Sequence, residues 1–407
     1  PYMQGITGAK KVDDSTVEIT TRGPNPVLLP QLTEVRIMSK AWSTKHNVTK
    51  PQDYKNKEET YASRNANGTG PYVLKSREAD VKTVLVLNSN WWGKMEGNVN
   101  EIVYQPIKQD GTRVAALLSG EVDFVLDPPP QDIPRLRKEA KVKVMDGNEN
   151  RTVFFGFDQW RDELQYASVK GKNPFKDVRV RRAFQLAVDV NALRTQVMRG
   201  LSTPTAILTP NPKGEGIPAE LDKRLPYDVA AAKALLAEAG YPNGFGFTLH
   251  CPNDRYVNDE KICVALGAMW ARIGLAVKVE TMPKAQYFQR TPKKEFSACM
   301  QGWGDNNRDA MFTLRPLYHS LDAATGRGDT NYGNFRNAEV DALIQKAEPE
   351  MDAARRQGYI NEAIRILQKE VNAIPLHRQV TPWISRANVT VTHRSDNWLW
   401  PLWVTVK

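Results

Sequence analysis

Residues 247–279 read FTLHCPNDRYVNDEKICVALGAMWARIGLAVKV. Residues 247–249 predict a strand, and Asn258 or Asp259 begins a helix whose apolar residues recur at helical spacing from Ile262 to Ile273. Glycine ends this helix, and apolar residues then alternate over positions 275–279, which predicts a second strand. A strand, a helix and a second strand in this order favour a parallel pair, and hence an α/β fold.

The same alternation of strands and helices extends over most of the chain. Strands are predicted at residues 12–21, 72–74, 83–87, 102–107, 122–126 and 153–157, and helices at residues 110–120, 177–188, 228–239, 339–347 and 353–373. Residues 374–383 form a short apolar segment broken by proline, and residues 389–406 predict further strands. A chain of 407 residues exceeds a single core, so we expect two or three α/β lobes.

Composition narrows the function classes. Hydrophobic residues make up 41% and charged residues 25%, which is ordinary for a globular protein. No apolar run approaches the roughly 20 residues of a membrane span, and residues 1–8 carry no signal peptide pattern. The formal net charge of +10 is spread along the chain, which favours a solvated basic surface over a nucleic-acid site.

Cysteine and histidine spacing gives no sign of a metal site. The cysteines are Cys251, Cys263 and Cys299, which permit at most one disulfide and leave their pairing open. The five histidines are scattered, and no two stand four residues apart on a predicted helix. We therefore expect no bound metal and no cofactor.

Motifs of common enzyme classes are missing from the sequence. It contains no G-x-S-x-G elbow, no HExxH, no P-loop and no G-x-G-x-x-G after a strand. A pair of carboxylates of the glycosidase kind stays open as an alternative. A binding protein, not an enzyme, is the favoured interpretation.

Several segments, taken together and in order, resemble one family. They are GTGPY at residues 68–72, NSNWWG at 88–93, LSGEVD at 118–123, FKDVRVRRA at 175–183, YDVAAAKALL at 227–236 with AGYP at 239–242, Gly302-Trp303, and IPL at 374–376. This series is similar to that of the peptide/nickel-type bacterial extracytoplasmic solute-binding proteins, family 5. The resemblance covers nearly the whole chain.

The resemblance implies a periplasmic-binding-protein-like fold of type II, cluster C. It has two α/β lobes, hinge strands and an extra domain, which here would be partial, because a segment of roughly 100 residues, about the size of a small domain, normally precedes residues 12–21 in that family. The expected division is residues 1–67 as the remnant of the extra domain, 68–152 with 385–407 as lobe I, and 153–384 as lobe II. The hinges are expected near residues 151–153 and 384–387.

The implied role is that of the substrate-binding component of an ABC importer. Such a protein is a periplasmic monomer that captures a small peptide between its lobes, closes on it and delivers it to membrane permease subunits. The ligand class stays open between a peptide and an oligosaccharide, an opine-like conjugate or a metal chelate.

A peptide zwitterion needs an anion for its ammonium and a cation for its carboxylate. In dipeptide-binding relatives an aspartate three residues after the tryptophan takes the ammonium. In the segment that begins at Gly302, that position holds Asn306, and Asp305 stands one residue earlier. We expect Asp305 to bind the ammonium and Trp303 to form an apolar wall, and we expect Gly302 and Asn306 to contact the ligand as well. The alternative is a turn in which Asp305 caps a helix.

The second candidate segment is the loop between the strand and the helix of residues 247–273. The carboxylate-binding arginine of the family lies in the equivalent loop, which points to Arg255. Loops at the carboxyl ends of strands are where α/β folds place ligands. We expect Arg255, Tyr256, Asn331 and Tyr332 to face one cleft; an exposed surface arginine is the alternative for Arg255.

Overall fold

The computed structural model describes residues 5–33, 35–53, 58–305 and 307–407. By internal packing the chain divides into unit 1, residues 1–34 with 148–381, and unit 2, residues 35–147 with 382–407. Strands β7 (Val142–Phe157) and β12 (Ala373–Arg386) each run from one unit into the other, and they contain most of the two expected hinges. The three-part division with an extra domain at residues 1–67 stays a prediction.

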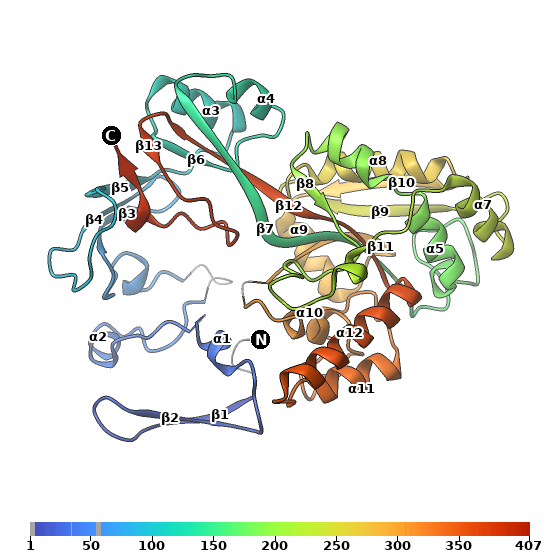
Figure 1. Cartoon of the computed structure of the whole chain (residues 1–407), viewed down its shortest axis with the longest axis horizontal. Coiled ribbons are helices and arrows are strands. Elements are labelled where there is room, and N and C mark those ends of the chain that lie inside the picture. The colour runs from blue at the N-terminus through green and yellow to red at the C-terminus, as the bar shows by residue number, and fades with distance from the viewer. Residues whose placement is uncertain (1–4, 34, 54–57, 306) are drawn as a thin grey trace. The chain divides into compact units, whose positions relative to one another are not determined.

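Unit 1 is built on one mixed sheet (Figure 1). Its strands follow the order β10-β9-β11-β7-β12, and β8 (Ser202–Pro204) pairs with β12. β9 (Gly246–Pro252) is parallel to β10 (Ala276–Met282) and to β11 (Ala298–Gly304), whereas β11 is antiparallel to β7. The carboxyl ends of β9 and β11 therefore lie at the same edge of the sheet.

The crossover predicted from residues 247–279 is confirmed. Helix α8 (Asp259–Ala271) connects β9 to β10, and Gly274, at a φ of 91°, turns the chain into β10. A left-handed φ favours glycine at this position because a side chain would be strained there. The disulfide Cys251–Cys263 joins the end of β9 to α8, and Cys299 is free and buried.

Alternate residues of β7 enter two separate cores because successive side chains of a strand point to opposite faces. Phe155 and Phe157 pack with Phe184 and Trp270 in one core, which holds α5 (Val178–Leu186) and α7 (Val229–Glu238) against the sheet. Phe154 enters the other core. That second core is formed largely by α10 (Met311–Leu317), α11 (Ala338–Ala347) and α12 (Ala353–Glu370).

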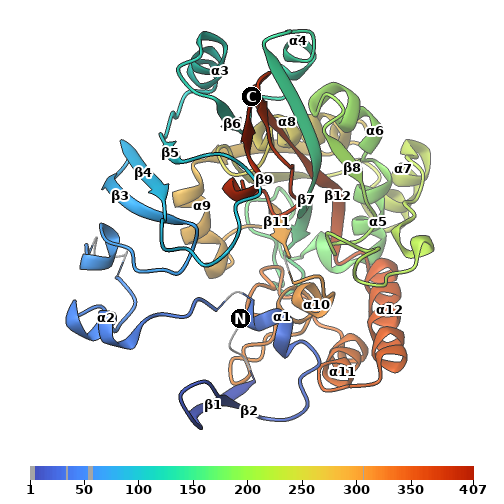
Figure 2. The same cartoon turned by 60° about the vertical axis from the view of Figure 1, so that its left-hand side comes forward.

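Polar side chains cap several of the helices in unit 1. The side chains of Asp177 and Asp228 accept backbone N–H bonds at the starts of α5 and α7. Asn337 and Asp352 do the same for α11 and α12, which pack side by side (Figures 1 and 2). Asp110 differs: it is the first residue of α3 (Asp110–Ser119) and makes no cap hydrogen bond.

The prediction of a short, proline-broken segment at residues 374–383 is wrong. These residues lie inside the long strand β12. Periodicity could not show this because both faces of the strand are covered, so nearly every residue from 373 to 385 is buried and no alternation appears. Unit 1 further contains β1 (Ile6–Lys11), β2 (Val17–Thr21), α1 (Leu28–Leu32), α6 (Val190–Ala192) and α9 (Lys284–Arg290).

Unit 2 contains a sheet of order β3-β4-β5, from Tyr72–Glu78, Lys82–Leu87 and Glu101–Tyr104, with antiparallel neighbours. The strand β6 (Phe124–Leu126) pairs with the end of β12, and β13 (Val389–Thr390) pairs with β14 (Thr405–Val406). The remaining helices are α2 (Lys40–Lys45), α3 and α4 (Ile133–Leu136). Residues 389–406 are thus mostly loop between two short strands.

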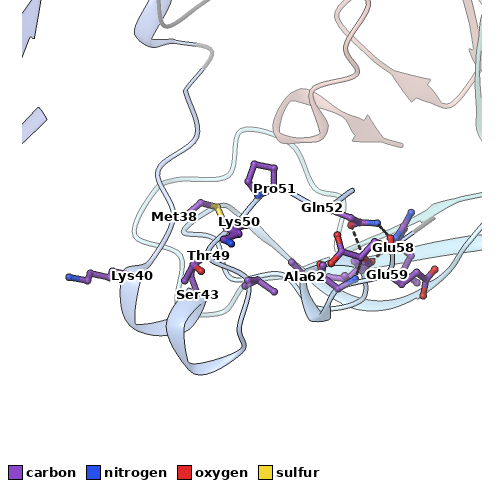
Figure 3. A pocket seen from close by; sticks show the side chains of 15 residues that line it. Met38, Lys40, Ser43, Thr49, Lys50, Pro51, Gln52, Glu58, Glu59 and Ala62 are labelled. Carbon is purple, nitrogen blue, oxygen red and sulfur yellow. Dashed lines mark hydrogen bonds between the residues drawn. The ribbon is translucent and has the colours of Figure 1, made fainter. Parts of the chain in front are cut away.

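An open pocket of about 1080 Å³ lies within unit 2 (Figure 3). Residues of the segments 38–63 and 74–77 line it. Some of the lining residues are hydrogen-bonded to one another: Ser63 donates to the side-chain oxygen of Gln52, and Gln52 donates to the backbone oxygen of Glu58. None of the residues expected to bind the ligand lines this pocket.

Candidate functional site

Two chain segments meet where β9 and β11 end. The loop at residues 253–258 follows β9, and the segment at residues 305–310 follows β11. Because the two strands are parallel, both segments leave the sheet at the same edge, which is where α/β folds bind ligands. This edge carries five of the residues that are predicted to bind the ligand, namely Asp305, Trp303, Gly302, Arg255 and Tyr256, and their binding role stays a prediction.

Gly302 and Tyr256 are in direct contact. A Cβ atom at Gly302 would lie 2.4 Å from Cε1 of Tyr256, so only glycine lets the ring pack against β11. The Tyr256 hydroxyl donates to the backbone oxygen of Gly302 at 3.5 Å, and the side chain is 7% exposed. The ring of Tyr256 therefore packs the loop after β9 against the last residues of β11.

Arg255 lies on the exposed side of the same loop. Its guanidinium stands over the Tyr256 ring, 5.1 Å from the centroid, which is a cation–π distance. The buried carboxylate of Asp259 accepts the backbone N–H groups of Arg255 and Tyr256 and so shapes the loop. The exposed guanidinium has its donors available to a ligand carboxylate, but ligand contact by Arg255 stays a prediction.

Asp305 is the buried carboxyl group at the end of β11, with 2% of its surface exposed. Its N–H donates to the backbone oxygen of Asn150, and its Oδ1 accepts the backbone N–H of Asn307 at 2.7 Å. Its Oδ2 is buried and has no hydrogen bond of standard geometry among the described residues, but the backbone N–H groups of Arg308 and Asp309 lie close enough to the carboxyl group to oppose the rise of its pKa. Burial, reinforced by the nearby Asp309 carboxylate, raises the pKa of Asp305 to about 7.

The other residues of this segment have different roles. Trp303 is partly buried against the second core, and its Nε1 lacks a partner in the part of the chain that the structure describes. Asp309, not Asp305, bonds the backbone N–H at the start of α10, and Arg356 binds its two oxygens at 2.7 and 2.8 Å. Asn306, also expected in the site, lies outside the described residues.

Asn331 and Tyr332 occupy a turn in unit 1. The Asn331 amide donates to the backbone oxygens of His319 and Phe335 and accepts the N–H of Phe335, so its side chain is used to close that turn. Tyr332 is partly buried, and burial is the main cause that raises the pKa of its hydroxyl to about 12, with Tyr256 among the smaller electrostatic influences. Ligand contact by either residue stays a prediction.

Glu215 was not expected in the site. It lies on the loop between β8 and α7, only 6% exposed, with Oε1 accepting the backbone N–H of Asn211 and Oε2 lacking a partner among the described residues. Burial, and secondarily the Asp305 charge, raises the pKa of Glu215 to about 8. The segment NPKGEGIP at residues 211–218 predicts only a loop, so no sequence signal marks this carboxyl group.

Arg151 is a further arginine near Tyr256. Its Nε donates to Glu149 at 3.0 Å, and the other Glu149 oxygen accepts from Gln379. The Gln379 amide oxygen in turn accepts the backbone N–H of Val257, which ties β7 and β12 to the loop after β9. The charges of Arg255 and Arg151 both counter the upward shift that burial causes in the pKa of Tyr256.

Within the described ranges, no three histidine, cysteine, aspartate or glutamate side chains gather as a metal site would require. Over the same ranges, no helix has the length and apolar character of a membrane span. The site thus consists of buried carboxyl groups, an indole and arginines at a sheet edge, an arrangement suited to holding charged groups of a ligand.

The fold defines a class of protein. The periplasmic binding protein DppA of Helicobacter pylori, solved with the peptide STSA, superposes with a TM-score of 0.78 at 24% identity, over 97% of this chain and 75% of that chain. The fold is that of the periplasmic binding proteins, which confirms the predicted fold class.

The family follows from the sequence. Residues 1–325 match the bacterial extracellular solute-binding proteins, family 5 Middle, and the chain belongs to that family. Heme-binding protein A of Haemophilus influenzae is 29% identical over 402 residues, 95% of this chain and 65% of that protein. Di/tripeptide-binding protein 1 of Pseudomonas aeruginosa is 29% identical over 315 residues, which are 76% of this chain and 55% of that protein. The chain thus spans less than two thirds of the length of these relatives.

Proposed function

We propose that this protein is the substrate-binding component of an ABC importer and that its ligand is a small peptide. The observation that carries the proposal is the buried Asp305 carboxyl group, whose Oδ2 has no partner among the described residues, in a member of a solute-binding family. A buried carboxylate without a partner is costly, and a ligand ammonium would remove that cost by forming a charge-assisted hydrogen bond.

The carboxyl groups of the site favour a peptide over haem as the ligand. Haem carries two carboxylates and brings no cation, so it would leave Asp305 and Glu215 buried without a compensating charge. A peptide ammonium has the opposite sign. The match to a heme-binding protein, 29% identical over 95% of this chain, keeps haem as the second candidate, to be decided by measurement.

Arg255 is the proposed partner of the peptide carboxylate. Its guanidinium is exposed on the loop after β9 and presents two parallel donors in the geometry that a carboxylate accepts. A binding role without catalysis, a periplasmic location and transfer of the ligand to membrane permease subunits complete the proposal. Closure of two lobes around the ligand stays a prediction.

Isothermal titration with Ala-Ala tests this function. The protein is first unfolded and refolded to remove co-purified ligand, and released material is identified by mass spectrometry. Asp305→Asn should weaken Ala-Ala binding by roughly 100-fold, the 2–3 kcal/mol expected for a charge-assisted hydrogen bond at a buried site. Glu163→Gln, which alters an exposed carboxylate that forms an ion pair with Lys170, is the matched control and should bind normally.

The outcomes separate the candidates. Released peptides together with a large loss for Asp305→Asn support the proposal. Released haem, or tight haem binding that Asp305→Asn strengthens, would replace it with the second candidate. Equal Ala-Ala affinity in the wild type and in Asp305→Asn would remove Asp305 from the site.

A further inference from the structure

Two buried carboxyl groups in unit 1 share one structural property. In Glu215 and in Asp305, one oxygen accepts a backbone N–H, and the other oxygen is buried without a partner in the described residues. Their exposed fractions are 6% and 2%. The two groups also influence each other electrostatically, because the Asp305 charge acts on Glu215. Their loops also contact neighbouring residues of α12, because Gly216 lies against Gln357 and Arg356 binds Asp309. The two carboxyl groups therefore come from separate loops that pack against the same helix.

The nearby charged groups do not neutralise this pair. Arg356 is engaged by both oxygens of Asp309, and Arg378 donates to Asp222 at 2.8 Å. The Arg378 charge reaches Glu215 and reduces the cost of its ionisation, but it makes no hydrogen bond to it in the described structure. Each of the two carboxyl groups thus has one oxygen without a hydrogen bond of standard geometry in the part of the chain that the structure describes.

Asn307 adds an independent sign of a ligand. Its side chain is 8% exposed, and neither its amide nitrogen nor its amide oxygen has a partner among the described residues. Its backbone N–H donates to the Asp305 carboxylate, so Asn307 lies next to this carboxyl group. Buried polar groups are nearly always hydrogen-bonded, and such an accumulation calls for a missing partner.

Glu215 is held in place by its own loop. Its N–H donates to the backbone oxygen of Asn211, whose N–H in turn bonds the Glu215 carboxylate. Gly216 follows at a φ of 70°, with the Gln357 amide 3.0 Å from the position of a Cβ atom. A residue other than glycine would be strained here, so the loop backbone fixes the direction of the Glu215 side chain.

We infer that Glu215 determines ligand specificity beside Asp305, and that the pair selects peptides whose first residue carries a second ammonium group, such as lysine. This inference rests on the proposed function. A single α-ammonium compensates one carboxylate and leaves the other buried and unpaired, whereas an N-terminal lysine brings two cations joined by a short alkyl chain. The unpaired amide oxygen of Asn307 is a further acceptor for the extra donors.

Isothermal titration at pH 8 with Lys-Ala and norleucine-Ala tests the inference, since the second peptide keeps the chain length of lysine without its charge. The wild type should bind Lys-Ala roughly tenfold more tightly or better, about 1.4 kcal/mol. In Glu215→Gln this preference for Lys-Ala over norleucine-Ala should fall to within about threefold. Glu163→Gln should retain the wild-type ratio.

Each outcome has a distinct meaning. If the wild type binds norleucine-Ala at least as well as Lys-Ala, or if Glu215→Gln keeps the preference, Glu215 does not set specificity, although the peptide proposal survives. If neither peptide binds the wild type, the proposed function fails and this inference fails with it. Competition of an equimolar mixture for the wild type, read by native mass spectrometry, decides the preference even if Glu215→Gln does not fold.

Discussion

At the scale of single residues, the cost of burying charge dominates the site. Asp305 and Glu215 sit where water is excluded, and each retains an oxygen without a hydrogen-bond partner in the described residues. Burial makes proton loss harder, so both groups hold their protons to higher pH in the folded protein than in the unfolded chain. A ligand cation would let both groups ionise without that penalty.

The first prediction concerns pH and stability. Unfolded aspartate and glutamate titrate near pH 4, whereas the folded pKa values are raised to about 7 for Asp305 and about 8 for Glu215. The folded state therefore binds more protons between these limits, and the ligand-free protein should lose stability as the pH rises from about 4 to 8. Charged groups that act on the pair are Asp309 and Arg378.

Thermal melting of the stripped protein at pH 5 and pH 8 measures this effect. Glu215→Gln removes one titrating group, so its melting temperature should fall less over this range than that of the wild type, by a few °C. Asp305→Asn should behave in the same way. Glu163→Gln should follow the wild type, and identical slopes for all four proteins would contradict raised pKa values in the site.

The second prediction concerns Gly302. In Gly302→Ala the new methyl group would meet the Tyr256 ring, which has to move, at a cost of about 1–3 kcal/mol in the free energy of unfolding. Gly358→Ala is the control, because Gly358 is exposed inside α12 with open space around it. This substitution should stabilise the protein by about 0.5–1 kcal/mol. Denaturant unfolding measures both changes, and an unaltered stability of Gly302→Ala would show that Tyr256 does not pack there.

At the scale of secondary-structure elements, the site depends on one pair of parallel strands. β9 and β11 deliver their following loops to the same edge, and the loop after β9 is held on both sides. The Asp259 carboxylate accepts the backbone N–H groups of Arg255 and Tyr256 in this loop. The Cys251–Cys263 disulfide links the end of β9, before the loop, to α8, after it. The loop with Arg255 is therefore positioned by covalent and hydrogen-bonded constraints.

The third prediction concerns the disulfide. Removing it should cost about 2–4 kcal/mol of stability, because closing a loop of this length restricts the unfolded chain. Cys251→Ala/Cys263→Ala should melt at a lower temperature than the oxidised wild type and bind Ala-Ala more weakly. Reductant should lower the melting temperature of the wild type but not of this variant; three free thiols in the oxidised wild type would disprove the bond.

At the scale of the whole molecule, the site draws on distant parts of the sequence within one packing unit. The loops at residues 211–218, 253–258 and 305–310 all belong to unit 1. Family members with this fold include proteins named for haem and for peptides, so the fold alone does not select a ligand. Selection depends on the side chains at the sheet edge.

The fourth prediction concerns the location of binding. Hydrogen exchange of the stripped protein with and without Lys-Ala should show slower exchange in the loops at residues 211–218 and 253–258, because ligand bonds suppress local opening. The exposed hairpin of β1 and β2 should exchange equally in both conditions. Protection that spares both loops would place the ligand elsewhere on the protein.

Much of the fold was accessible from the sequence because it depends on local patterns. Asp228 and Gly240 bound a helix by capping and by a left-handed turn, and the β9–α8–β10 crossover follows from periodicity and handedness. The strand β12 was missed because a strand buried on both faces shows no alternation.

The sequence by itself determined the family, the α/β class and the segment around Asp305, because motif order and residue spacing are properties of the chain. Only the tertiary structure decided that Glu215 is buried within reach of the Asp305 charge, that Asn331 serves its own turn, and that Gly302 makes room for Tyr256. The reason is physical: burial and the charges of neighbours set what a side chain can do, and both arise from residues far apart in the chain that folding brings together.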